Sequence, residues 1–210
     1  TTTDAVSPRP DSRDATGDPF RLIGIVAAGV AGLAGLVVLL YATSIHVAAG
    51  ASDKATTILV GQAIGAGHIL LHGWTLPPGN YWTTDAAIYA VAIRMFGLRP
   101  GLLYSEPALV AAVTIVVGVF IARHGRRGAA GVAGAVAVIV LLAFATPAMA
   151  LWFVGNGFHL ATALYSLVAF VWLRRGGFGW RWAAAVALLT FGMIGDLEIA
   201  FFALAPLAFA

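Results

Sequence analysis

Long apolar runs alternate with short charged segments along most of this chain. They lie near residues 22–45, 102–122, 128–146, 151–173 and 182–195, and a sixth begins at residue 199. The first has 24 positions without a charge, about 36 Å of helix at roughly 1.5 Å per residue, whereas a bilayer core is about 30 Å thick. We therefore predict an all-α fold, a polytopic transmembrane helix bundle over residues 21–210.

The two ends of the chain depart from this pattern. Residues 1–20 hold four Asp, two Arg and three Pro, and such a segment cannot bury enough apolar surface to offset its chain entropy, so a disordered cytoplasmic tail is expected. A secretory signal peptide is the alternative for residues 22–45, but its apolar region usually has about 7 to 15 residues. Because the chain stops inside the apolar run "FFALAPLAFA", we expect it to be the N-terminal part of a longer protein.

Composition supports a membrane protein and excludes several functions. The chain is 60% hydrophobic and 10% charged, with a mean hydropathy of +0.93, far from the roughly one-quarter charged content of soluble domains. The net charge is +3, but the basic residues sit in short clusters beside apolar runs, so we expect no nucleic-acid partner. Without cysteine, disulfides, thiolate metal sites and cysteine nucleophiles are excluded.

The basic residues predict an orientation. If each long apolar run crosses the bilayer, nine of the twelve basic residues fall on one side, which is expected to be the cytoplasm of a bacterial plasma membrane. The acids outside the tail fall on the other side. The nine are Arg9, Arg13, Arg21, Arg123, Arg126, Arg127, Arg174, Arg175 and Arg181, and the acids are Asp53, Asp85, Glu106, Asp196 and Glu198.

The extracytoplasmic loop at residues 47–101 is too long for a simple connection. Ser52 is a suitable N-cap for a helix from Asp53 that ends at Gly65. Thr84 similarly precedes residues 85–96, whose apolar positions follow helical spacing. We predict two helices that lie along the membrane surface.

Asp53 and Asp85 each stand where one of these helices begins. A favourable interaction with the helix dipole explains an acid there without any function. The same geometry also holds an ionised carboxylate on a rigid element, where it can act as a general base or bind a cation. Both interpretations remain open on the residues alone.

Two histidines and three aromatics lie between these helices. His68 and His72 would share a helix face, as zinc ligands do, but Gly67 and Gly73 weaken that helix and no third ligand is nearby, so an interfacial or substrate-contacting role for His72 is favoured. The aromatics have two explanations, membrane anchoring or contact with a sugar or lipid. They are Trp74, Tyr81 and Trp82.

Acids near the apolar runs are the other candidates. Glu106, with Arg94 and Arg99 nearby in sequence, marks either an exposed ion pair or a water-filled cavity. Asp196 and Glu198 lie between apolar segments, where two acids are costly in lipid, so a polar cavity or functional site is the default hypothesis.

Asn156 and His159 carry the weakest signal. Their expected role is hydrogen bonding between helices, and we assign them no place in a site. The motifs of soluble enzymes, such as GxSxG, Walker A and the Rossmann fingerprint, do not occur in a suitable context.

The order of these features resembles the GT-C superfamily of polytopic glycosyltransferases, which take sugars from polyprenyl-phosphate carriers. Its first outer loop opens with an acidic motif and reaches a proline-rich step before the next helix. Here "SDKATTILVGQAIGAG" and "LPPGNYWTTDAAIYAVAIRMFG" stand at these places. The stretch "LLHGWTLPPGNYWTTDAAIYA" is also similar to a group of uncharacterised actinobacterial membrane proteins.

The resemblance implies roles for particular residues. Asp53 takes the catalytic acidic position and Asp85 that of a second acid. Lys54 replaces the usual second acid of the motif, and two residues separate Pro77 and Pro78 from Tyr81, so metal dependence through a divalent cation stays open. The implied substrate-binding residues are Lys54, His72, Trp74, Tyr81, Trp82, Arg94, Glu106, Asp196 and Glu198.

The expected function is that of an integral membrane glycosyltransferase. It would move a sugar from a polyprenyl-phosphate donor to a cell-envelope acceptor on the extracytoplasmic face. The alternative is a membrane transporter or non-catalytic scaffold, in which Asp196, Glu198 and Glu106 line a permeation path.

Overall fold

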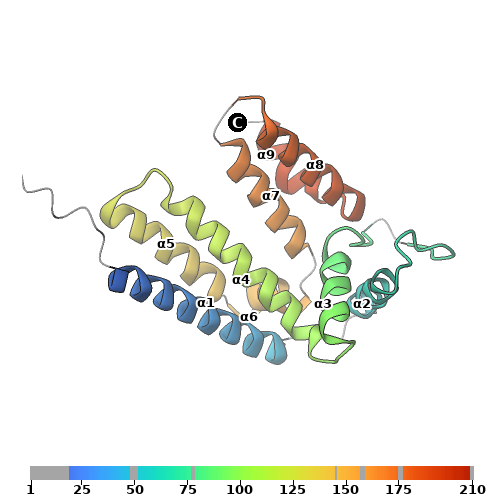
Figure 1. Ribbon diagram of the computed structural model, residues 1–210. Coiled ribbons are helices and arrows are strands. Elements are labelled where there is room, and N and C mark those ends of the chain that lie inside the picture. Colours follow the sequence, from blue (N-terminus) through green and yellow to red (C-terminus); the bar gives the residue numbers. More distant parts are fainter. Residues whose placement is uncertain are drawn as a thin grey trace, which may run out of the picture. The chain divides into compact units, whose positions relative to one another are not determined.

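The computed structural model describes residues 19–47, 52–76, 79–144, 146–156, 159–174 and 177–208 (Figure 1). This part of the chain is helical and contains no strand, which confirms the all-α prediction. Residues 1–18 of the predicted tail lie outside the described residues, as do Pro77, Pro78 and Arg175.

Within the part of the chain that the structure describes, two helices are long and apolar enough to cross a membrane. They are residues 22–47 of α1 (Pro19–Val47) and all of α4 (Leu102–Arg123). Helix α4 is 44% buried within its most apolar stretch, and it carries much of the main core. These helices support the prediction of a membrane protein with transmembrane helices, while the number of crossings stays a prediction.

The contacts of α1 change along its length. The part of α1 up to Gly35 belongs to a different compact unit from the described residues that follow, and the large apolar side chains described within residues 22–35 are exposed. From residue 36 onward the helix packs on the core, where Leu40 is buried and the Ser44 hydroxyl donates to the Val154 carbonyl at 2.9 Å.

The third and fourth predicted spans have a different form in the structure. Helix α5 (Gly128–Ala143) is followed by α6 (Pro147–Ala150) and the π-helix η2 (Leu151–Asn156), and the direction changes by 79° across the break. Pro147 accounts for the break, because proline lacks an N–H and disfavours helical geometry at the preceding residue. Residues 128–155 are therefore one broken span or a re-entrant segment.

Residues 151–173 do not form the single helix that the apolar run suggests. Helix α7 (Leu160–Leu173) begins after His159, whose left-handed φ of 62° separates it from η2. Helix α8 (Trp180–Gly195) packs on α7 through small side chains such as Ala169 and Ala185. The start of the predicted sixth span forms η3 (Ala200–Leu204) and α9 (Ala205–Ala208).

Helices α2 (Ser52–Gly65) and α3 (Asp85–Phe96) occur where the sequence predicts them. They approach closely at Gly61, where a Cβ would lie 2.7 Å from the Cβ of Tyr89. Their predicted position along the membrane surface stays a prediction. One detail differs from expectation: Thr84 occupies the N-cap position of α3, but its side chain makes no capping hydrogen bond, and its hydroxyl is buried.

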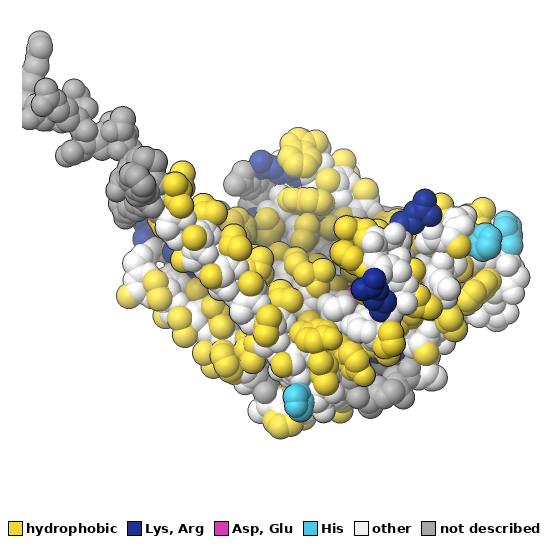
Figure 2. Space-filling model, turned by 60° about the horizontal axis from the view of Figure 1, so that its bottom comes forward, with side chains coloured by type: hydrophobic (Ala, Val, Ile, Leu, Met, Phe, Trp, Pro, Cys, Tyr) yellow, Lys and Arg dark blue, Asp and Glu magenta, His cyan; other side chains and the backbone are white. Residues whose placement is uncertain are grey.

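Apolar side chains cover most of the face drawn in Figure 2, and Lys, Arg and His side chains appear there only in a few separate places. Large exposed apolar residues occur on many helices, for example Leu22, Leu141 and Phe201, which are 65%, 69% and 77% exposed. Soluble monomers rarely expose apolar surface on this scale. The surface is therefore suited to lipid.

Candidate functional site

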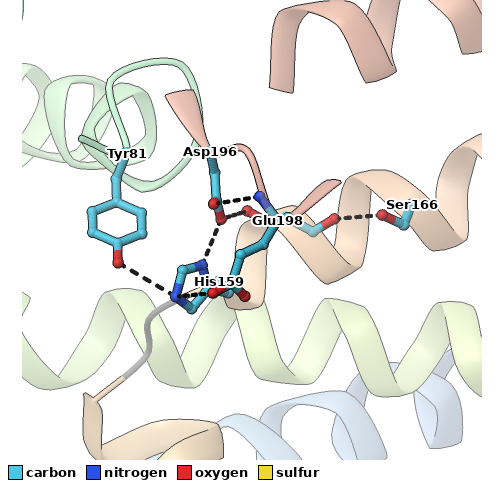
Figure 3. Close-up of polar contacts among 6 residues, drawn as sticks. Tyr81, His159, Ser166, Asp196 and Glu198 are labelled. Carbon is cyan, nitrogen blue, oxygen red and sulfur yellow. Dashed lines mark hydrogen bonds and ion pairs between the residues drawn. The ribbon is translucent and has the colours of Figure 1, made fainter. Parts of the chain in front are cut away.

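A histidine held between acids lies where α7 begins and α8 ends (Figure 3). His159 Nδ1 lies 2.6 Å from Asp196 Oδ2, and His159 Nε2 lies 3.3 Å from Glu198 Oε1. The Thr162 hydroxyl donates to the same Asp196 oxygen, and the Glu198 N–H donates to Asp196 Oδ1 at 3.0 Å. Asp196 is almost completely buried and its carboxylate oxygens are bonded.

Tyr81 joins this group from the loop between α2 and α3. Its hydroxyl lies 3.5 Å from His159 Nε2, and the two rings meet edge to face with centroids 5.4 Å apart. Its N–H donates to the Gly195 carbonyl at 2.8 Å, which ties the loop to the end of α8. We call Tyr81, His159, Asp196 and Glu198 the histidine cluster.

Two residues of the histidine cluster have a strained backbone; Leu71, outside the cluster, is a third described residue of this kind. Tyr81 and His159 have φ values of 55° and 62°, in the left-handed region that side chains with a Cβ rarely adopt. Each such residue costs about 1 to 3 kcal/mol and persists where the surrounding contacts fix it, often at functional sites. Here the contacts of Tyr81 and the hydrogen bond from His159 to Asp196 supply that support.

The surrounding acids change how the cluster titrates. Burial opposes protonation of His159, but its hydrogen bond and charge interaction with Asp196, with Glu198 adding to them, raise the pKa of the imidazole overall. Burial, followed by the charges of Asp196, Asp85, Asp53 and Glu198, raises the pKa of Tyr81 to about 12. The phenol therefore stays protonated near neutral pH and can donate a hydrogen bond.

Asp53 and Tyr81 line the same groove. Its volume is about 310 Å³, and Asp53 is exposed at its edge. Asp53 is the one charged residue among the described lining residues. The side-chain oxygen Oδ1 of Asn80 accepts from the Trp82 N–H, so the side-chain NH₂ of Asn80 can donate to a bound molecule. The lining residues are Asp53, Thr56, Thr57, Val60, Leu76, Gly79, Asn80 and Tyr81. The groove can thus bind a neutral, hydroxyl-rich molecule beside one carboxylate.

Asp85, the other predicted catalytic acid, does not reach this groove. It is buried at the start of α3, and its Oδ2 has no hydrogen-bond partner among the described residues. Burial, with a contribution from the charge of Asp196, raises the pKa of Asp85 to about 6. Asp85 therefore acts on the site through its charge rather than through contact with a bound molecule.

Lys54 and Glu106 are also buried rather than open to a substrate. The Lys54 ammonium donates to the Gly155 carbonyl at 3.0 Å, and Glu106 interacts with it electrostatically from α4. Burial lowers the pKa of Lys54, although Glu106 opposes the shift. Lys54 was expected to bind substrate, but its side chain is only 5% exposed and is already hydrogen-bonded within the protein.

The remaining predicted residues lie apart from the histidine cluster. Arg94 is exposed, and its guanidinium donates to the Gly65 carbonyl at 3.4 Å. Trp82 packs in the core between α2 and α3. His72 and Trp74 line a separate groove of about 600 Å³ together with His68, and neither is among the described residues that line the groove of Asp53.

The residues do not fit a metal held by the protein alone. Among the described residues, no group of three His, Asp or Glu side chains is arranged to hold a metal ion. The groove supplies one carboxylate, whereas divalent cations generally need several oxygen ligands.

His159 is the residue that sequence reasoning undervalued. An isolated histidine beside an apolar run carries no local signal of function. The available signal was that His159, Asp196 and Glu198 all fall on the predicted outer side of the membrane. Two acids are costly in lipid, and a nearby histidine can pair with them.

Comparison of the chain with protein-family models, curated proteins and solved structures gives no match.

Proposed function

We propose that this protein is an integral membrane glycosyltransferase that uses a polyprenyl-phosphate sugar on the outer face of a bacterial plasma membrane. The observation that carries the proposal is the groove in which Asp53 lies beside Tyr81, backed by the histidine cluster. The apolar helices of the protein would keep this groove next to a lipid-soluble donor.

The groove suits the acceptor rather than the donor. Sugar hydroxyls need hydrogen-bond donors and acceptors, which the Asn80 amide, the threonine hydroxyls and the Tyr81 phenol provide. No lysine or arginine lies among its described lining residues, so an anionic phosphate would be unfavourable beside Asp53. The donor phosphate would therefore remain on the lipid side of the reacting sugar.

In the proposed step, Asp53 acts as the general base. As an acceptor hydroxyl oxygen forms a bond to the anomeric carbon, its proton moves to the Asp53 carboxylate. The bond between that carbon and the phosphate oxygen breaks, and polyprenyl phosphate leaves with the electron pair. Direct attack from the opposite face inverts the configuration at the anomeric carbon.

Tyr81 and His159 have supporting roles in this proposal. The protonated phenol of Tyr81 donates to an acceptor oxygen and so orients it toward Asp53. His159, held by Asp196 and Glu198, positions Tyr81 at the groove. His159 is thus a positioning residue, and its loss should affect acceptor KM more than the loss of Asp53 does.

The test uses the full chain in lipid nanodiscs with synthetic polyprenyl-phosphate donors that carry ¹⁴C-labelled hexoses or pentoses, and alkyl glycosides as acceptors. Asp53→Asn is expected to lower kcat by about 10² to 10⁴, the usual contribution of a general base. His159→Gln is expected chiefly to raise the acceptor KM. Labelled product is counted after separation from the lipid donor.

His68→Gln is the control, because His68 is exposed in the other groove. It should leave both kinetic parameters within about twofold, as surface changes away from a site usually do. Transfer at the wild-type rate by a folded Asp53→Asn protein would refute the role of Asp53. Failure of a photoreactive polyprenyl phosphate to label residues near the groove would argue against the donor.

One observation favours transport as a second candidate. Glu106 is buried in a helix long enough to span the membrane, with Oε1 lacking a partner among the described residues and Lys54 and Asp85 interacting with it. Ionisable residues inside spans often mark ion or proton paths. Proton uptake into proteoliposomes can be followed with an enclosed pH-sensitive dye. Uptake that is abolished by Glu106→Gln but not by Asp53→Asn would favour transport.

A further inference from the structure

A further hollow lies at the ends of α7 and α8 that are opposite to the histidine cluster. It has a volume of about 210 Å³ and is formed where α4 and α7 end and α8 begins. Its lining residues are Phe120, His124, Val171, Trp172, Arg174, Trp180 and Arg181. We call this hollow the arginine cavity.

The charge of the arginine cavity is of one sign. Arg174 and Arg181 contribute two guanidinium groups, His124 adds an imidazole from a third segment, and none of the described lining residues is acidic. Guanidinium groups bind phosphate oxygens in a bidentate manner and keep their charge at all physiological pH values. The cavity therefore has the chemistry of a phosphate site.

The start of α8 adds to this preference. Its N-cap, Gly179, provides no side-chain hydrogen bond, and the first turn holds no acid. The free N–H groups at a helix N-terminus favour an anion through hydrogen bonds and the helix dipole. The backbone and the two arginines thus attract the same kind of ligand.

The aromatic residues around the arginine cavity are typical of a membrane interface. Phe178 and Trp180 are 88% and 70% exposed, and Phe178 contacts Trp182 with ring centroids 5.2 Å apart. The Arg181 guanidinium lies 5.4 Å from the Trp180 ring. Exposed tryptophans and arginines together are typical of the level at which lipid headgroups lie.

We propose that the arginine cavity binds the phosphate headgroup of an anionic phospholipid. Its acyl chains would follow exposed apolar side chains of the adjoining helices, such as Phe120 and Val186. Basic pockets between membrane helices are a recognised type of lipid site. This inference does not depend on the glycosyltransferase proposal, because it concerns the other ends of the helices.

The test measures lipid binding to the full chain by native mass spectrometry, with phosphatidylglycerol compared with phosphatidylcholine. The wild type is expected to prefer phosphatidylglycerol. The double variant Arg174→Gln/Arg181→Gln is expected to bind it roughly thirtyfold more weakly, from the usual contribution of each basic residue near an anionic lipid. Its binding of phosphatidylcholine should not change.

The matched control is Arg126→Gln/Arg127→Gln, which removes the same charge near the end of α4 but outside the cavity lining. It should keep the preference for phosphatidylglycerol. Equal weakening by both double variants would show general surface charge and overturn the proposal. If the first double variant does not fold, the single change Arg174→Gln, at an exposed residue, replaces it.

Competition with millimolar inorganic phosphate distinguishes a bound phospholipid from a bound free anion. It should leave bound phosphatidylglycerol in place, because the acyl chains contribute to binding of the lipid alone. Displacement of the lipid by phosphate, or tight binding of phosphate in detergent without lipid, would overturn the assignment to a phospholipid. Equal wild-type affinity for the two lipids would do the same.

Discussion

The two ends of helices α4, α7 and α8 carry charges of opposite sign. The acids at one end are buried within the protein, whereas the arginines at the other end are open to solvent or lipid. At the end with the histidine cluster, Asp85, Glu106 and Asp196 are 5%, 5% and 1% exposed. At the other end, Arg174 is exposed and Arg181 is partly exposed around an open cavity. The acids act mainly within the protein, whereas the arginines remain available to lipid.

This difference has a physical cause. A buried carboxylate loses its hydration and must recover hydrogen bonds from the protein or change its protonation. Asp196 recovers them from His159, Thr162 and the Glu198 N–H. An exposed guanidinium keeps its hydration at little cost, so it needs no fixed partner. Asp196 is therefore held by several hydrogen bonds, whereas the guanidinium groups at the arginine end stay open to a ligand.

The largest expected effect on stability comes from replacing Asp196, the buried acid with the most hydrogen bonds. Asp196→Ala removes the acceptor for both His159 and the buried Thr162 hydroxyl, and should lower the free energy of unfolding by about 2 to 4 kcal/mol. Asp196→Asn retains an acceptor and should cost less. Thermal unfolding in nanodiscs measures the stability of both variants. Equal losses would mean that the hydrogen bonds accepted by the Asp196 side chain do not stabilise the fold.

A smaller effect is expected from crowding the junction between α8 and the Tyr81 loop. A Cβ at Gly195 would lie 2.6 Å from Thr83 Oγ1 and 2.8 Å from Thr83 N, so Gly195→Ala should cost about 1 to 3 kcal/mol. At the arginine end, a Cβ at Gly179 meets no atom within 4 Å. Gly179→Ala should therefore lower the melting temperature less than Gly195→Ala does. A larger loss from Gly179→Ala would contradict the difference between the two ends.

Asp85 gives a pH-dependent test of the buried acidic end. Its folded pKa of about 6 lies above the ordinary value of 3.8, so the folded state holds its proton more tightly than the unfolded state. Stability from this group is present at low pH and is lost as pH rises between those two values.

Asp85→Asn cannot ionise and should avoid that loss. The melting temperature of the variant relative to wild type is expected to rise between about pH 4 and about pH 7 and then to level off. Melting curves over that range provide the measurement. A difference that stays constant with pH would show that Asp85 is not an acid destabilised by burial.

The smallest effect is expected at the exposed basic end. Arg127 lies at the N-cap position of α5, where its side chain makes no capping hydrogen bond, and it is exposed. Arg127→Gln should change the free energy of unfolding by less than about 0.5 kcal/mol. A loss comparable with that of Asp196→Ala would mean that the two ends do not differ as described.

Local signals predicted the helices best. Ser52, Asp53 and Gly65 marked the ends of α2, and the spacing of apolar residues located α3. Such signals act over one or two turns, so a sequence displays them directly. Apolar length alone did not locate the break between η2 and α7, because it cannot show a left-handed residue such as His159.

The candidate site was predicted only in part. Asp53, Tyr81, Asp196 and Glu198 were expected at one side, and the structure brings Tyr81, Asp196 and Glu198 together around His159. Lys54 and Asp85 were expected to face a substrate, but the structure buries them. Whether a polar side chain points outward or inward depends on which helix covers it, and no local pattern records that.

By itself, the sequence determined that this protein is helical, that it has helices able to cross a membrane, and that its acids beyond residue 20 and most of its arginines lie in separate segments. These properties follow from composition and short-range spacing. Only the tertiary structure decided that His159 meets Tyr81 from 78 positions away and Asp196 from 37. Contacts over such separations depend on how the helices pack, because packing fixes which side chains share a buried space and must satisfy one another.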